Sequence, residues 1–269
     1  MPYAILYDST RCIECRMCVD ACRLKWDLPK TGESRLSENA FTILENRNGH
    51  PIRRMCMHCL EPACASVCPV GALEKTENGP VVYHADRCMG CRYCMMACPF
   101  GVPKYEWSSA VPRVRKCVMC FDRIDEGKKP ACTMVCPEDA IRFGEREELL
   151  AEAHARLRAE PGRYHPHVYG EREAGGTSVL VIASVPPGEL GLPSDLPEQA
   201  MPERTWQVLS RLPGVVVVGA AFCTGMWWLI NSNKIETDRI GPVAVIRRRD
   251  FEKVKKKREE SQMTEEDLG

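Results

Sequence analysis

Alternating apolar and polar positions predict short strands along the first part of the chain. Residues 3–7 alternate as a half-buried strand does, and the β-branched run at 177–185 is typical of a buried strand. Residues 40–44 are a further strand candidate. A turn signal at 78–80 (Asn-Gly-Pro) leads into 81–83, which predicts a hairpin.

Helical periodicity begins at Glu145 and ends at the breaker pair Pro161-Gly162. The apolar residues of this segment fall on one helical face: Leu149, Leu150, Ala153 and Leu157. We therefore expect a helix that packs on the domain and carries no chemistry. Residues 186–203 are rich in proline, which predicts a semi-rigid linker.

The longest apolar stretch lies at 212–233, where 22 successive residues carry no charge. As a helix it would be about 33 Å long, which matches a hydrocarbon core of about 30 Å. A buried core helix is the alternative. Tryptophans at 206, 227 and 228 stand where interfacial anchors do, so we expect a transmembrane helix in contact with membrane lipid. Cys223 lies within this helix among small residues suited to close helix packing.

The flanking charges predict the orientation of this span. Ten lysines and arginines lie between 234 and 258, whereas only Arg204 and Arg211 stand in the twenty residues before 212. Positive charge stays inside, so the tail should be cytoplasmic and the preceding domain periplasmic, at a bacterial inner membrane. Residues 1–11 show no secretory or twin-arginine signal, so we expect export together with a signal-bearing partner.

Overall composition excludes one class of partner. Charged residues make up 28% of the chain and sum to zero net charge, so nothing favours binding to nucleic acid.

The chemistry of the chain lies in its 17 cysteines, of which sixteen form four runs. Two runs have the spacing C-x2-C-x2-C-x3-C, and the other two have longer gaps. They are Cys12, Cys15, Cys18 and Cys22; Cys56, Cys59, Cys64 and Cys68; Cys88, Cys91, Cys94 and Cys98; and Cys117, Cys120, Cys132 and Cys136. The stretch after Cys68 (Pro-Val-Gly-Ala-Leu) is echoed after Cys136 (Pro-Glu-Asp-Ala-Ile), which indicates an internal repeat.

This spacing is typical of iron–sulfur clusters. In bacterial ferredoxin runs three thiolates bind one cluster and the fourth cysteine binds a neighbouring one. A [4Fe–4S] cluster takes four thiolates, so sixteen cysteines predict four clusters. Disulfide scaffolds are much shorter chains, and zinc sites lack the third cysteine and the trailing Cys-Pro. His58, inside the second run, either tunes a cluster through a hydrogen bond or is an ordinary structural or surface histidine.

The chain resembles the four-cluster β subunits of membrane-bound respiratory oxidoreductases. The resemblance rests on the order of the runs and on the motifs at 91–99, 102–105, 143–144, 169–171 and 175–177. It is strongest to the iron–sulfur subunits of hydrogenase-2-type [NiFe] complexes and next to the β subunit of formate dehydrogenase N. Related dimethyl sulfoxide and polysulfide reductase subunits share the runs but usually lack the anchor.

The resemblance implies a cross-pairing of ligands between runs. The four sets are Cys12, Cys15, Cys18 and Cys136; Cys22, Cys117, Cys120 and Cys132; Cys56, Cys59, Cys64 and Cys98; and Cys68, Cys88, Cys91 and Cys94. We refer to them below as sets one to four. Cys22 is followed by arginine, where the ferredoxin pattern has proline.

The resemblance also implies an α+β fold of two ferredoxin-like double-cluster units, one nested in the other, plus the C-terminal transmembrane helix. The expected regions are a four-cluster domain at 1–145, with the second unit at about 51–112; a helix, strand and Pro-rich connector at 146–203; an anchor at 204–233; and a basic tail at 234–269.

The expected function is a non-catalytic electron relay. Electrons would pass from a periplasmic catalytic subunit, a [NiFe] hydrogenase that oxidises H2, to an integral membrane subunit that reduces quinone. The alternative is the β subunit of a molybdenum or tungsten formate dehydrogenase or a related molybdopterin enzyme. A zinc-binding membrane-anchored scaffold is a remote third possibility.

Overall fold

The computed structural model describes residues 2–30, 32–232 and 255–256, in two compact units, Met1–Trp206 and Gln207–Gly269. The first unit contains a three-stranded sheet in the order β8 (Ile141–Glu145), β1 (Tyr3–Asp8) and β9 (Val179–Ile182). The central strand β1 runs antiparallel to β8 and parallel to β9. The strand predicted at 3–7 is therefore confirmed, and the one predicted at 177–185 is confirmed in its central part, Val179–Ile182.

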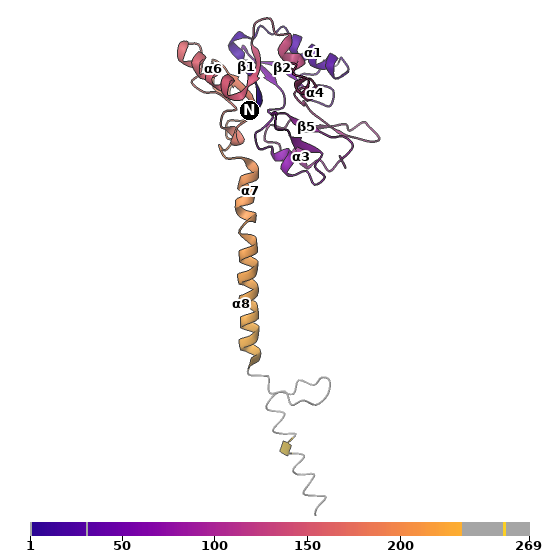
Figure 1. Ribbon diagram of the computed structural model, residues 1–269, viewed down its shortest axis with the longest axis vertical. Helices are drawn as coiled ribbons and strands as arrows, with labels where there is room; N and C mark the ends of the chain where they lie inside the picture. The colour runs from indigo at the N-terminus through magenta and orange to yellow at the C-terminus, as the bar shows by residue number, and fades with distance from the viewer. Residues whose placement is uncertain (1, 31, 233–254, 257–269) are drawn as a thin grey trace, which may run out of the picture. The chain divides into compact units, whose positions relative to one another are not determined.

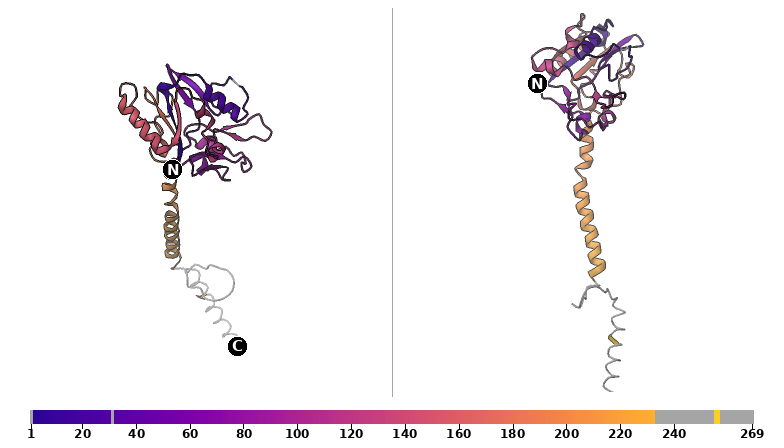
Figure 2. Two further views of the ribbon diagram at one scale, coloured as in Figure 1. Left: turned by 45° about the horizontal axis from the view of Figure 1, so that its top comes forward. Right: turned by 90° about the vertical axis from the view of Figure 1, so that its right-hand side faces the viewer.

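Both faces of β1 are buried, because the chain covers each with a different partner. Ala4 and Leu6 pack against helix α6 (Arg146–Ala159), which lies on one face of the sheet (Figure 2). Ile5 and Tyr7 point to the other face, into a core that also contains cysteines. The helix predicted from Glu145 is confirmed, with Leu149, Leu150 and Ala153 buried and Leu157 partly buried against the same core.

Three short antiparallel pairs complete the strands of this unit. They are β2 (Ile43–Arg47) with β3 (His50–Arg54), β4 (Leu73–Lys75) with β5 (Val81–Tyr83), and β6 (Lys104–Tyr105) with β7 (Val114–Arg115). The hairpin predicted around 78–80 is confirmed. The strand expected at 40–44 is displaced, because residue 40 forms an isolated bridge with Ser37 and the ladder begins only at Ile43.

The remaining elements are short and join the strands (Figure 1). They are η1 (Ser9–Arg11), α1 (Met17–Lys25), α2 (Ala63–Ser66), α3 (Tyr93–Ala97), α4 (Phe121–Asp125), α5 (Ala131–Met134) and η2 (Glu173–Gly175). Gly79 lets the β4–β5 hairpin approach β1, where the Tyr3 N–H donates to Asn78 O at 2.9 Å. A Cβ at Gly79 would meet Tyr3 O at 2.5 Å, and its φ is +111°.

The Pro-rich segment 186–203 packs on the first unit and is not a free spacer. Leu190 is 1% exposed, and Arg54 donates to the carbonyls of Leu190 and Gly191 at 2.9 and 2.8 Å. Tyr169 Oη donates to Pro193 O at 2.9 Å. The expectation of a semi-rigid linker is wrong for this part of the segment, because Leu190 and Leu192 are buried.

Two helices follow, α7 (Met201–Leu209) and α8 (Leu212–Ser232). The stretch Met201–Asn231 contains an 18-residue window with a mean hydropathy of 1.7, and this window is not buried, so the stretch is long and apolar enough to cross a membrane. The predicted cytoplasmic tail at 234–269 lies outside the described residues except for 255–256.

Candidate metal centres

The cysteine loops share an unusual backbone conformation. The residue before the second cysteine of each run has a positive φ: Glu14, His58, Gly90 and Met119, with values from 49° to 74°. A left-handed residue also precedes α1 and α3, at Arg16 and Arg92. Such conformations cost a non-glycine residue about 1–3 kcal/mol each and persist only where the surroundings impose them. A turn at the same position in all four runs indicates that they share one loop conformation.

A second repeated turn follows the Cys-Pro pairs. The third residue after Cys68, Cys98 and Cys136 has a positive φ in each case: Gly71, Gly101 and Asp139. In the first copy the Ala72 N–H donates to Cys68 Sγ at 3.2 Å. Burial raises the pKa of Cys68, but hydrogen bonds from the backbone N–H groups of Val70 to Leu73 lower it by more. The net shift of the pKa is therefore downward, which favours the thiolate.

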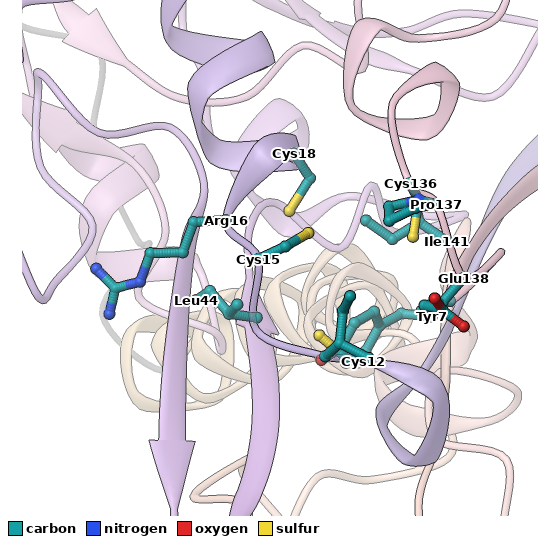
Figure 3. A pocket seen from close by; sticks show the side chains of 12 residues that line it. Tyr7, Cys12, Cys15, Arg16, Cys18, Leu44, Cys136, Pro137, Glu138 and Ile141 are labelled. Atoms are coloured by element: carbon teal, nitrogen blue, oxygen red, sulfur yellow. The ribbon is translucent and has the colours of Figure 1, made fainter.

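The first group of cysteines lines a single pocket, although its members come from distant parts of the chain. Cys12, Cys15 and Cys18 face Cys136 across it (Figure 3). Tyr7, Leu44 and Ile141 are among the residues that form its walls. The structure therefore brings together three cysteines of the first run and the last cysteine of the fourth.

The second group lies where α1 meets α5. Burial raises the pKa of Cys22 to about 12, and the largest contribution from another thiolate comes from Cys132. Burial likewise raises the pKa of Cys117, with Cys22 as the largest charged contributor. The pKa of Cys120 is also raised by burial, and Cys132 contributes to this shift. The last cysteine of the first run is thus among three cysteines of the fourth.

The cysteines of the second and third runs interact with each other across the two runs. Burial raises the pKa of Cys64 to about 12, and Cys56 and Cys98 raise it further. Burial also raises the pKa of Cys94, to about 11, where the other contributors are Cys88, Cys91 and Cys68. The pKa of Cys59 is raised by burial and, to a smaller extent, by the charges of Cys56, Cys98 and Cys64.

The thiols of each group do not meet at the position of a single metal ion. Among the residues that the structure describes, no three His, Cys, Asp or Glu side chains come close enough together to hold one metal ion. Cys223, the seventeenth cysteine, is exposed on α8.

Several buried cations near the cysteines were not found by reading the sequence. Arg53 and Lys116 are buried, and Lys75 donates to His58 O at 3.1 Å. No motif marks them, because an arginine or lysine in a short strand is ordinarily a solvated residue. His58 is fully buried, and its Nδ1 accepts from the Val81 N–H at 2.9 Å, so a surface position is excluded. Burial lowers its pKa well below the usual value, which keeps the ring neutral.

Comparisons with known proteins agree with the repeated cysteine loops. Two families, each described as a 4Fe-4S dicluster domain, match residues 50–146 and 11–72. A protein of Nitratidesulfovibrio vulgaris is 41% identical over 245 residues, which cover 84% of this chain and 66%, just under two thirds, of that relative.

Two relatives with functional names are also similar over most of their length. The hydrogenase-2 operon protein HybA of Escherichia coli O157:H7 is 38% identical over 268 residues, covering 80% of this chain and 81% of HybA. The formate dehydrogenase iron-sulfur subunit of Haemophilus influenzae is 31% identical over 260 residues, covering 87% of this chain and 82% of that subunit. The chain therefore belongs to the family of ferredoxin-type iron–sulfur β subunits, which transfer electrons in respiratory oxidoreductase complexes.

Proposed function

We propose that the sixteen cysteines hold four [4Fe–4S] clusters in the four cross-paired sets named above. The observation that carries this proposal is the pocket in which Cys136 faces Cys12, Cys15 and Cys18. The charge interactions of the other cysteines follow the same division. Each run then supplies three ligands to one cluster and one ligand to another, as ferredoxin loops do.

The chemistry of the donor set fits an iron–sulfur cluster. Buried thiols with pKa values of about 11 to 12 stay protonated at neutral pH unless a cation compensates their charge, and iron supplies that cation. Thiolates arranged around a pocket suit a group of several atoms better than a single zinc ion. Each bound cluster would supply a one-electron carrier.

The chain's own residues hold and shield these carriers. Eight of the sixteen cysteines are buried, which keeps water from their thiols. Backbone N–H groups donate to sulfur, as the Met119 N–H does to Cys117 Sγ at 3.3 Å. Burial and hydrogen bonds to sulfur are two of the protein's means of setting a cluster potential. We assign no catalytic residue to the chain.

The sets form a linear path in our proposal. Neighbouring sets are linked by charge interactions between Cys18 and Cys132, between Cys117 and Cys56, and between Cys64 and Cys94. These links support the order one, two, three, four. They also support the nested arrangement, since sets one and two use residues on both sides of the segment at about 51–112 that carries sets three and four.

Within the complex, we propose that electrons come from a catalytic subunit that oxidises H2, a [NiFe] hydrogenase, and go to an integral membrane subunit that reduces quinone. The similarity to HybA over 81% of its length supports this reading. The β subunit of a formate dehydrogenase or a related molybdopterin enzyme is the alternative, which the Haemophilus subunit supports.

The domain is proposed to be periplasmic and anchored through residues 212–233. The apolar helix α8 supports the anchor, and the charge asymmetry of the sequence supports the orientation. A chain that ends at residue 203 should leave the membrane fraction with its iron in place, because all sixteen cysteines precede residue 137. Retention of that shortened chain in the membrane after a high-salt wash would contradict the anchor.

Metal analysis of the purified complex tests the relay. The full chain, tagged at residue 269 and extracted in detergent, should carry about four irons per cluster with equal acid-labile sulfide. Co-purified nickel supports the hydrogenase reading, and molybdenum or tungsten supports the alternative. Zinc in place of iron would reject the electron-transfer function altogether.

A further inference from the structure

Among the residues that the structure describes, Arg53 is a buried cation with no carboxylate paired to it. It lies on β3, where its Cα is paired with that of Leu44, and the residue is 5% exposed. Its guanidinium donates to Met55 Sδ at 2.7 Å, and its Nε has no hydrogen-bond partner among the described residues. No described carboxylate lies within 4.0 Å of it. An unpaired buried charge is costly, so the site must contain a compensating anion.

The anionic groups around Arg53 are cysteines of two different sets. Cys18 belongs to set one, and the remaining neighbours belong to set two: Cys22, Cys117 and Cys132. A guanidinium is protonated throughout the physiological pH range, so Arg53 carries a full positive charge. The geometry agrees, because Leu44, which is paired with Arg53 across the β2–β3 hairpin, lines the pocket of set one. The guanidinium is therefore shared between sets one and two.

We propose that Arg53 is a positioning charge that raises the reduction potentials of the clusters in sets one and two above those that a neutral residue would give. The inference rests on the proposed function, since it requires both clusters. Reduction adds one electron to a cluster from the preceding carrier, no bond is made or broken, and no proton is required. A fixed positive charge in a medium of low dielectric constant stabilises the more negative, reduced form.

The neighbouring arginine provides a matched control. Arg54 lies on the same strand, but it donates to the carbonyls of Leu190 and Gly191 and pairs with Glu45 at 3.6 Å. Removing its charge changes the net charge of the chain by the same amount as removing that of Arg53. Arg53→Met and Arg54→Met therefore separate a local effect on the clusters from a general one.

The test is a redox titration of the full chain, followed by electron paramagnetic resonance, in detergent with the subunits that co-purify. In Arg53→Met two of the four potentials should fall, each by at least a tenfold change in the reduction equilibrium, or about 59 mV for a one-electron couple. The other two should stay in place, as should all four in Arg54→Met. Arg53→Lys, which keeps the charge, should produce smaller shifts than Arg53→Met.

Iron and sulfide content is measured in each variant, so that failed assembly is recognised. Loss of iron from Arg53→Met with full loading of Arg53→Lys overturns the proposal, because the charge would then serve to hold the clusters and not to set their potentials. Loss from both variants overturns it in favour of a packing role. Four unchanged potentials in a fully loaded Arg53→Met overturn it as well. Absence of [4Fe–4S] signals from the wild-type chain, in contrast, rejects the proposed function itself.

Discussion

Tyr7 Oη donates to the carbonyl oxygen of Pro51 at 2.9 Å, and both residues are buried. This bond ties the central strand β1 to the β2–β3 hairpin beside the pocket of set one. The same carbonyl accepts from Ser9 Oγ at 2.6 Å, so two hydrogen bonds hold Pro51 to this part of the chain. The hairpin that carries Arg53 is thereby fixed against the sheet from which the first cysteine run departs.

Replacing Tyr7 by Phe should have a modest effect. The ring still fills its place, and Ser9 still satisfies the Pro51 carbonyl, so we expect a loss of about 1 kcal/mol in the free energy of unfolding. Tyr7→Ala should cost about 3–5 kcal/mol, because it leaves a cavity in the core. Thermal unfolding of the iron-loaded chain measures both. Equal losses for the two variants would mean that the hydroxyl, and not the ring, carries the contribution.

Asp8 is a buried acceptor for several donors at the end of β1. Its carboxylate accepts from Tyr164 Oη at 2.8 Å, from Arg156 at 2.7 Å and from the Thr10 hydroxyl at 2.8 Å. Asp8→Ala leaves a largely buried guanidinium short of one partner, so we expect a loss of about 3 kcal/mol or more in the free energy of unfolding. In a double-mutant cycle, Asp8→Ala combined with Arg156→Met should cost less than the sum of the single losses. Additive losses would show that the two residues do not interact.

Gly79 and Gly49 provide a pair of variants that separates close approach from backbone strain. Both have a positive φ, of +111° and +87°, but a Cβ at Gly49 meets nothing within 4 Å. Gly49→Ala should cost about 1–3 kcal/mol from its backbone alone. Gly79→Ala should cost a further 1–3 kcal/mol or so, because the hairpin must move away from Tyr3. Equal melting temperatures of the two variants would exclude the contact with β1 as a source of stability.

The cross-pairing predicts which cluster each cysteine variant loses. Cys98→Ser should remove the signal that Cys59→Ser removes, because both residues belong to set three, and it should spare the signal lost in Cys91→Ser. Cys223→Ser is the control and should keep all four clusters, since Cys223 lies on α8. Electron paramagnetic resonance of the reduced variants measures this. If Cys98→Ser and Cys91→Ser lost the same signal, the pairing would be wrong.

Removal of iron should unfold much of the first unit. Cysteines make up a substantial part of its largest buried core, so their packing depends on what they bind. We expect a chelator under reducing conditions to abolish cooperative thermal unfolding in residues 3–145, because metal-binding energy is folding energy in such domains. Helix α6 and its face of the sheet should resist longest, since that core contains no cysteine. Hydrogen exchange resolves the two regions, and uniform retention of protection would contradict the prediction.

The elements that could be predicted from sequence are those with local signals. The strand at residues 3–7, the helix from Glu145 and the hairpin at 78–83 each have their own periodicity or turn residues. The burial of both faces of β1 could not be predicted, because one face is covered by α6 and the other by the cysteine core. The packing of 186–203 was missed for a similar reason, since proline content says nothing about where Leu190 lies.

The cysteines were predicted by their spacing, whereas the residues that act on them were not. The spacing of the cysteines is a local property of each loop, so it can be read directly from the sequence. Arg53 has its role only through the neighbours that β3 gives it, since the residues flanking it, Ile52 and Arg54, lie in different surroundings. A histidine within a Cys-x2-Cys segment, such as His58, is ambiguous until its hydrogen bond to Val81 is known.

The pairing of β1 with β8 and β9 also determines when the domain can be completed during synthesis. At about 5–20 residues per second, β8 leaves the ribosome on the order of ten seconds after β1. Throughout that interval β1 has neither of its neighbouring strands to pair with. Cys12, Cys15 and Cys18 also lack Cys136, the fourth cysteine of their set. Three reduced thiols are then open to oxidation or to a wrong metal. We expect a nascent chain stopped before residue 136 to require a protecting factor, while one that extends past residue 182 no longer does.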